Sequence, residues 1–163
     1  MNVIATIQKM NWSKLGSLAL LCLRHPLYII PSYRATRKTV AVCDENFGSE
    51  HHKNGRANAF RHALWNVLLI HYCKKWFPSV MRAKAWAKRI TDWHEDFSPN
   101  TELARAMDYH NNRVGREFAM KHLDVGIGQL VQLTMVLVPL SRKHTSLSTI
   151  YSFPNILAHI EDD

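Results

Sequence analysis

Three short stretches of the sequence concentrate side chains that move protons or bind metal ions. The stretch NGRANAFRHALWN places Asn58, His62 and Asn66 four residues apart, so one helix would carry all three on a single stripe. The stretch TDWHED holds His94 and Glu95 side by side, and MDYHNNRVGRE adds carboxylate, imidazole, amide and guanidinium groups at helical spacing. Imidazoles and carboxylates are the groups of general acid–base catalysis and of zinc binding.

Each stretch alone has an ordinary structural explanation, because buried Asn and His side chains often satisfy one another and charges near helix ends are usually solvated. Together they favour a site, since every unsatisfied buried polar group costs roughly 1 to 3 kcal/mol and a structural helix could carry Leu there. Gly115 inside the third stretch costs about 1 kcal/mol relative to Ala. It indicates close approach of another backbone or of a ligand.

We interpret the three stretches as one polar site between helices. The candidate catalytic residues are His62, His94, Glu95 and Asp108; the candidate substrate-binding residues are Arg61, Asn66, Asn111, Asn112 and Arg116; the candidate metal ligands are His62, His94, Glu95, Asp108 and His110.

Two chemical versions of this site stay open. A divalent metal, zinc best matching the ligand types, would lower the pKa of a bound water to about 7. The sequence has no H-E-x-x-H pair, so the ligands would come from separate helices. Without metal, Glu95 would act as general base with His62 as its acid partner. Asp108 would orient a histidine, and Arg61 or Arg116 would clamp an anionic group.

The ordered set NAFRHALWN, HE and MDYHNNRVGR resembles the signature of a bacterial family of unknown function, Ala-Phe-Arg-His-Ala, His-Glu and Asp-x-His-Asn-Asn-x-x-Gly-Arg. Members occur as small stand-alone proteins and at the ends of polymorphic-toxin chains. The resemblance covers residues Asn54 to Glu117 and brings no defined reaction. It marks Arg61, His62, Asn66, His94, Glu95, Asp108, His110, Asn111, Asn112 and Arg116.

Apolar residues recur at helical rather than alternating spacing along the chain, which predicts an all-α fold of about six helices with no significant sheet. The expected helices cover residues 13–23, 31–47, 56–75, 80–93, 101–122 and 125–138. A chain of 163 residues with 47% hydrophobic residues fits one domain, 1–163. Within it we expect membrane-surface or packing helices in 1–50, a site-bearing core in 54–122 and a weakly ordered tail in 141–163.

The charge balance points to anionic partners. Lys and Arg number 21 against 13 Asp and Glu, and ten histidines add further proton-binding capacity. We therefore expect a hydrolase for a phosphoester or pyrophosphate bond of an anionic, lipid-linked substrate. Cys22, Cys43 and Cys73 lie far apart, which favours a reducing compartment and a cytoplasmic protein. The apolar and basic N-terminal stretch predicts peripheral contact with the inner face of an anionic membrane.

Two other function classes stay open. A nucleic-acid-binding protein would use the basic residues around Arg82 to Arg89, although no known binding motif frames them. A non-enzymatic, membrane-associated interaction protein would tolerate loss of all three polar stripes. The oligomeric state is not predicted by the sequence.

Overall fold

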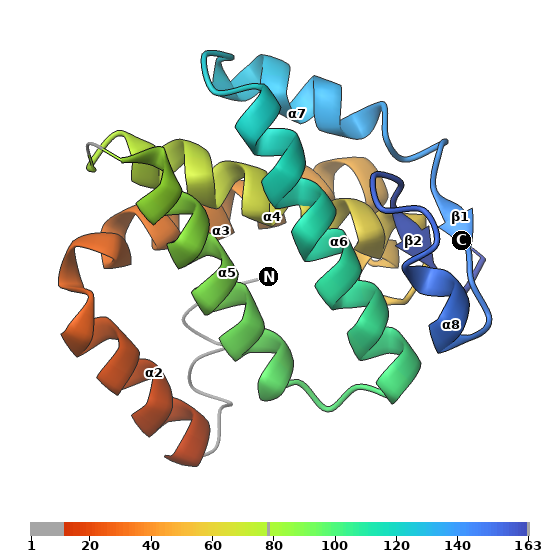
Figure 1. The fold of residues 1–163 in the computed structure, drawn as a ribbon, viewed down its shortest axis with the longest axis horizontal. Coiled ribbons are helices and arrows are strands. Elements are labelled where there is room, and N and C mark those ends of the chain that lie inside the picture. The colour runs from red at the N-terminus through yellow and green to blue at the C-terminus, as the bar shows by residue number, and fades with distance from the viewer. Residues whose placement is uncertain (1–11, 78, 163) are drawn as a thin grey trace.

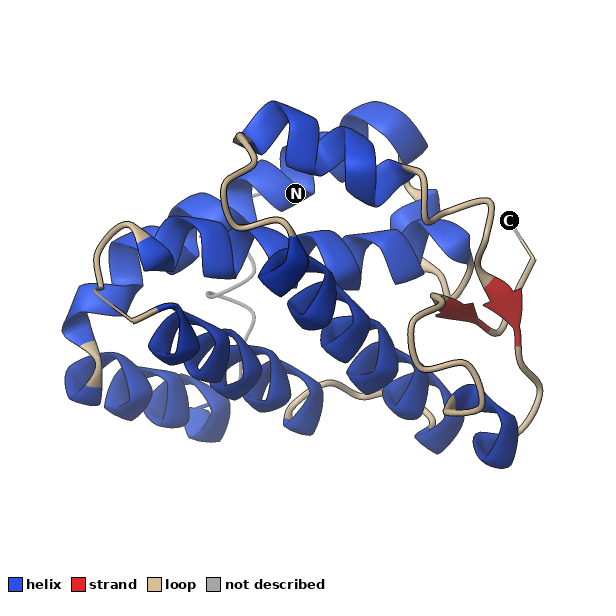
Figure 2. Cartoon of the chain, turned by 45° about the horizontal axis from the view of Figure 1, so that its top comes forward, coloured by secondary structure: helices blue, strands red, loops and turns tan. Residues whose placement is uncertain are grey.

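The computed structural model describes residues 12–77 and 79–162, and helices dominate this part of the chain (Figures 1 and 2). The all-α prediction is confirmed, with only a two-residue strand pair added. The elements among the described residues are α2 (Trp12–Arg24), η1 (Pro26–Tyr28), α3 (Ile29–Phe47), η2 (Glu50–His52), α4 (Arg56–Lys74), α5 (Val80–Asp96), α6 (Glu102–Lys121), α7 (Ile127–Met135), β1 (Arg142–Lys143), α8 (Leu147–Ile150) and β2 (Ala158–His159).

Helix α4 forms the centre of the fold. It contacts α3, α5, α6 and α7, and its buried residues occur on every side of the helix. Figure 1 shows α5 and α6 lying next to each other across α4, connected at one end by a short loop. Phe60, Leu64 and Leu68 of α4 are fully buried in the main apolar core. A helix that is buried all round cannot show an amphipathic pattern, so its polar residues have to face neighbouring helices.

The helix ends follow local rules. Gly48 has a φ of 55°, which glycine adopts without steric cost, and it ends α3. The Thr101 hydroxyl accepts a hydrogen bond from the Ala104 backbone N–H at 3.2 Å and caps α6. Helix α3 begins at Ile29 rather than at the predicted Pro31. Pro31 is tolerated in the first turn because backbone N–H groups there have no helical partner.

The C-terminal tail contains short elements that the sequence did not predict. Strands β1 and β2 pair in parallel, with Arg142 opposite Ala158, and Leu157 and Ile150 are buried. The Asn111 side chain of α6 donates to the Ala158 carbonyl at 2.8 Å and accepts from its N–H at 2.9 Å. Two-residue strands are too short to leave a recognisable period in the sequence, so their pairing depends on such tertiary contacts.

Among the residues described, no single helix is both long and apolar enough to cross a bilayer. Helix α2 and the segment Pro26–Phe47 meet the length and hydropathy criteria only as a pair. The chain bends by 104° between them.

Gly115 is where α6 approaches α4 most closely. A β-carbon at this position would lie 2.3 Å from the Ala63 carbonyl oxygen and 2.7 Å from the Ala63 Cα. Both are backbone atoms, so they cannot rotate away. The prediction that Gly115 permits a close backbone approach is therefore confirmed, and the partner is α4.

We expect Gly115→Ala to lower the free energy of unfolding by about 1 to 3 kcal/mol, because the added methyl overpacks the contact between α4 and α6. Gly128→Ala in α7 is the matched control, since its β-carbon would have no neighbour within 4 Å. Urea denaturation of the three proteins measures both effects. Equal stability of the two variants would contradict the packing argument.

Candidate functional site

One acid or imidazole side chain from each of α4, α5 and α6 meets in the interior of the bundle. These are His62, Glu95 and Asp108, exposed to 2%, 0% and 2%. One potential ligand atom from each lies within 4.8 Å of the other two. The three predicted stretches thus contribute one residue apiece to a common buried cluster.

The contacts of His62 distinguish its two ring nitrogens. Nδ1 lies 3.3 Å from Glu95 Oε1 and 3.3 Å from the Asn112 side-chain oxygen, both hydrogen-bond acceptors. Nδ1 must therefore carry a proton. Nε2 lies 3.1 Å from Asp108 Oδ1 and 3.0 Å from a guanidinium nitrogen of Arg61. The Nε2 side of the ring therefore faces Asp108 and Arg61.

A directed chain of hydrogen bonds holds Glu95 in place. Arg116 donates to the side-chain oxygen of Asn66 at 3.0 Å, so the Asn66 amide nitrogen is turned toward Asn112, to whose oxygen it donates at 2.7 Å. The Asn112 amide nitrogen in turn donates to Glu95 Oε1 at 2.9 Å. Because guanidinium groups only donate, the direction of every bond in the chain is fixed from Arg116. Glu95 receives donors, which favours its ionised form.

The pKa values of His62 and Glu95 shift in opposite directions. Burial alone would lower the pKa of His62, but the Asp108 and Glu95 carboxylates outweigh it and raise this pKa above its ordinary value of 6.5. Burial would raise the pKa of Glu95, yet His62 and the Asn112 amide lower it to about 2. Glu95 is therefore a permanent anion at neutral pH, and it favours protonation of the imidazole.

Asp108 behaves differently from Glu95. Burial raises its pKa to about 6, the Glu95 charge adds to this, and His62, Arg61 and Asn100 only partly oppose it. Asn100 donates to Asp108 Oδ2 at 2.8 Å, which leaves Oδ1 facing His62. The pKa values of His62 and Asp108 are thus both raised, and their facing atoms lie 3.1 Å apart. Neighbouring titratable groups with shifted pKa values are typical of acid–base sites.

Three of the predicted site residues point elsewhere. His94 adjoins Glu95 in the chain but faces Trp65, ring edge to ring face at 5.3 Å, and burial lowers its pKa to about 4. His110 follows Asp108 by two residues, which places it about 200° around the helix. Its Nε2 donates a hydrogen bond to the Ile156 carbonyl at 2.8 Å. Asn111 holds the tail through Ala158.

The other predicted substrate ligands divide into two kinds. Asn66, Asn112 and Arg116 are buried and occupied by the hydrogen-bond chain, so in this structure they position Glu95 and His62. Arg61 is partly exposed and lies against Nε2 of His62. Of this set, Arg61 is placed best to meet an anionic group.

Sequence reasoning missed two neighbours of the cluster as site residues. Asn100 precedes α6 in the loop, where an amide is typical of a helix cap, so nothing in the sequence connects it with Asp108 eight residues later. Thr91 accepts a hydrogen bond from Arg116 at 3.3 Å. Thr91 precedes Glu95 by four residues and so lies on the same helix face, and this spacing is the feature of the sequence that could have identified it.

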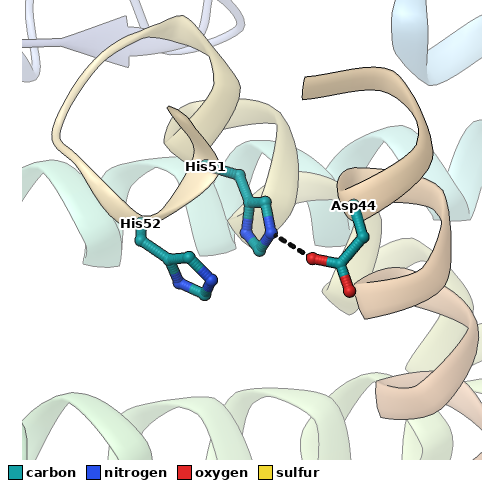
Figure 3. Close-up of side chains that lie close together, drawn as sticks. All are labelled: Asp44, His51 and His52. Atoms are coloured by element: carbon teal, nitrogen blue, oxygen red, sulfur yellow. Dashed lines mark hydrogen bonds and ion pairs between the residues drawn. The ribbon is translucent and has the colours of Figure 1, made fainter. Parts of the chain in front are cut away.

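A second group with metal-ligand types lies at the end of α3. Figure 3 shows the His51 ring of η2 directed at Asp44 of α3, with His52 beside it. His51 is fully buried, its Nε2 lies 2.8 Å from Asp44 Oδ1, and the His51 and His52 ring centroids are 4.0 Å apart. The contact ties η2 to the last turns of α3.

The fold and site define an all-α domain with a buried histidine–carboxylate cluster at the junction of three helices. The chain belongs to a family described as a domain of unknown function (DUF6973), whose model matches residues 19–138. This match includes α4, α5 and α6 and ends before β1. No curated protein and no solved structure matches the chain.

We expect Asp108 to make stability fall as the pH rises from about 4 to about 6. Its folded pKa of about 6 exceeds the ordinary 3.8, so between these values the folded state binds the extra proton. Asp108→Asn mimics the protonated form and should remove this decline, worth about 2 to 3 kcal/mol at pH 7. Urea denaturation at pH 4, 5, 6 and 7 measures it.

The measurements stay between pH 4 and pH 7 because Glu95 has the opposite effect on stability at lower pH. Its pKa is lowered from 4.5, so below pH 4.5 the free energy of unfolding falls as the pH falls. Asp124→Asn, at an exposed aspartate, is the control and should retain the wild-type profile. An Asp108→Asn profile parallel to that of the wild type would show that Asp108 has an ordinary pKa.

Proposed function

We propose that the chain is a hydrolase of phosphoester or pyrophosphate bonds, with His62 and Asp108 as its acid–base pair. The supporting observation is the 3.1 Å approach of His62 Nε2 to Asp108 Oδ1, while Nδ1 is held by Glu95. This arrangement separates an orienting carboxylate from a proton-exchanging one. Glu95, a buried anion occupied at Oε1, orients the ring and is not the general base.

The proposed reaction balances its protons within this pair. Asp108 Oδ1, as carboxylate, takes a proton from a water molecule, whose oxygen bonds to phosphorus while the bond to the leaving oxygen breaks. His62, as imidazolium, gives its Nε2 proton to that leaving oxygen. The products leave Asp108 protonated and His62 neutral. Proton transfer from Oδ1 to Nε2 then restores the starting state.

An anionic substrate suits the charges around the cluster. The guanidinium of Arg61 lies 3.0 Å from Nε2 and would pair with a phosphoryl oxygen. Because His62 itself is 2% exposed, ligand entry requires side chains over the cluster to move. The partly exposed neighbours Arg61, Trp65 and His94 indicate the side from which a phosphoryl group would enter.

We expect His62→Ala to lower kcat for bis(p-nitrophenyl) phosphate or pyrophosphate about 10²- to 10⁴-fold, the usual contribution of a general acid–base group. Glu95→Gln should lower kcat and also move the upper-pH limb of the rate profile to lower pH, because the imidazolium loses its stabilising anion. His52→Ala, at an exposed histidine outside the cluster, is the control. Unchanged hydrolysis in His62→Ala would refute the proposal and favour a non-enzymatic binding protein.

A second version of the site includes a divalent cation held by His62, Glu95 and Asp108. Its supporting observation is that Glu95 Oε2 is buried and has no hydrogen-bond partner within the described chain. A lone carboxylate oxygen in a low-dielectric interior is costly, and a cation would satisfy it. Imidazole with two carboxylates fits zinc, which would acidify a bound water.

Metal content separates the two versions. For the metal-bound form, protein equilibrated with zinc and then desalted should retain a single ion, lost in Glu95→Gln and in Asp108→Asn but kept in His52→Ala. Mass spectrometry of the metal measures this. Zinc lost only in His52→Ala would assign the ion to the Asp44, His51 and His52 group. Hydrolysis that continues without bound metal would contradict the metal-bound version and leave the acid–base pair as the catalyst.

A further inference from the structure

One end of the bundle combines exposed aliphatic side chains with positive charge. The bend between α2 and α3 and the connection between α4 and α5 both lie at this end, at the left of Figures 1 and 2. The two segments are in contact, because the Tyr28 ring stacks on Phe77 at 4.0 Å and on Trp86 at 4.6 Å. We call this region the apolar end. Its exposed hydrophobic residues include Leu23, Leu27, Ile29, Ile30, Trp76 and Met81.

The exposure of these residues is unusually high for their type. Leu23 is 78% exposed and Leu27 is 60% exposed, whereas the core leucines, such as Leu64, are fully buried. Scattered single apolar residues on a surface are ordinary, whereas a group at one end of a molecule indicates an interaction surface. Trp76, with its apolar ring and polar N–H, is a side chain typical of the boundary between lipid and water.

The charge next to the apolar end is of one sign. Residues 1–91 carry 15 Lys and Arg against only three Asp and Glu, while residues 92–163 carry six against ten. Four of these basic residues are exposed in the segments that form the apolar end, and none of them forms an ion pair with another described residue. They are Arg24, Arg34, Lys75 and Arg82.

We propose that the apolar end docks on a bilayer surface that contains anionic lipids. Leu23, Leu27 and Ile30 would enter the boundary between headgroups and acyl chains, and the neighbouring cations would contact lipid phosphates. The 104° bend between α2 and the following segment presents its aliphatic side chains at a corner, which suits shallow insertion rather than crossing. This inference is independent of the hydrolase proposal.

Two other occupants fit this surface less well. A nucleic acid would use the cations, but water-exposed phosphates would leave the aliphatic side chains without a partner. A second copy of the chain meeting this end symmetrically would place like charges opposite one another. An anionic bilayer satisfies both the aliphatic groups and the cations.

The test is co-sedimentation of the full chain with vesicles of phosphatidylcholine, with or without phosphatidylglycerol. We expect binding to the anionic vesicles, weakened by 0.5 M salt. Leu23→Glu/Leu27→Glu should reduce the partition coefficient at least tenfold. Lys75→Gln/Arg82→Gln should reduce it about 25-fold on anionic vesicles, at roughly fivefold per charge.

The matched control is Val136→Glu/Leu140→Glu, at two residues about 60% exposed after α7 and away from the apolar end. It should bind as the wild type does, with the same thermal unfolding midpoint for all variants. Equal binding by the Leu23→Glu/Leu27→Glu variant and the wild type would overturn the proposal. So would equal binding to neutral and anionic vesicles, or binding to duplex DNA without binding to vesicles.

Discussion

A carboxylate that is cut off from water has to be met by donors, and this requirement organises the junction of α4, α5 and α6. Glu95 is fully buried, and a chain of amides that starts at Arg116 ends on its Oε1. Each bond in this chain fixes the orientation of the next side chain, so the arrangement has a single direction. The last consequence is chemical, since an anionic Glu95 fixes the Nδ1 proton of His62 and leaves Nε2 toward Asp108.

Close backbone packing of α4 against α6 makes this series of hydrogen bonds possible. The side chains of Asn66 and Asn112 are short, and they meet at 2.7 Å only because α6 runs close to α4. That approach is permitted by the absence of a side chain at Gly115, which lies against the Ala63 backbone. A larger residue at position 115 would push α6 away from α4 and break the hydrogen bond between Asn66 and Asn112. Packing and polarity at this junction therefore depend on the same interhelical distance.

The sequence contained most of the fold and part of the site. Helical spacing predicted α4, α5 and α6, and the stripe containing His62 and Asn66 predicted which face of α4 is polar. Spacing could not show that His94 faces Trp65 while its neighbour Glu95 faces inward, because both positions are polar in sequence. It also could not show that Asn111 binds the tail or that Asn100 reaches Asp108, since these contacts join elements whose relative placement is set by tertiary packing.

The proposed chemistry depends on one state of His62, in which Glu95 holds the ring through Nδ1 and Asp108 faces Nε2. Nitrogen-15 NMR of the histidine rings as a function of pH tests this state directly, with His62→Asn used to assign the signals. We predict a His62 pKa above 6.5 and a neutral form protonated at Nδ1, with the pKa lowered in Glu95→Gln. A neutral form protonated at Nε2, or a His62 pKa that is below 6.5 and unaffected by Glu95→Gln, would contradict this state of the ring.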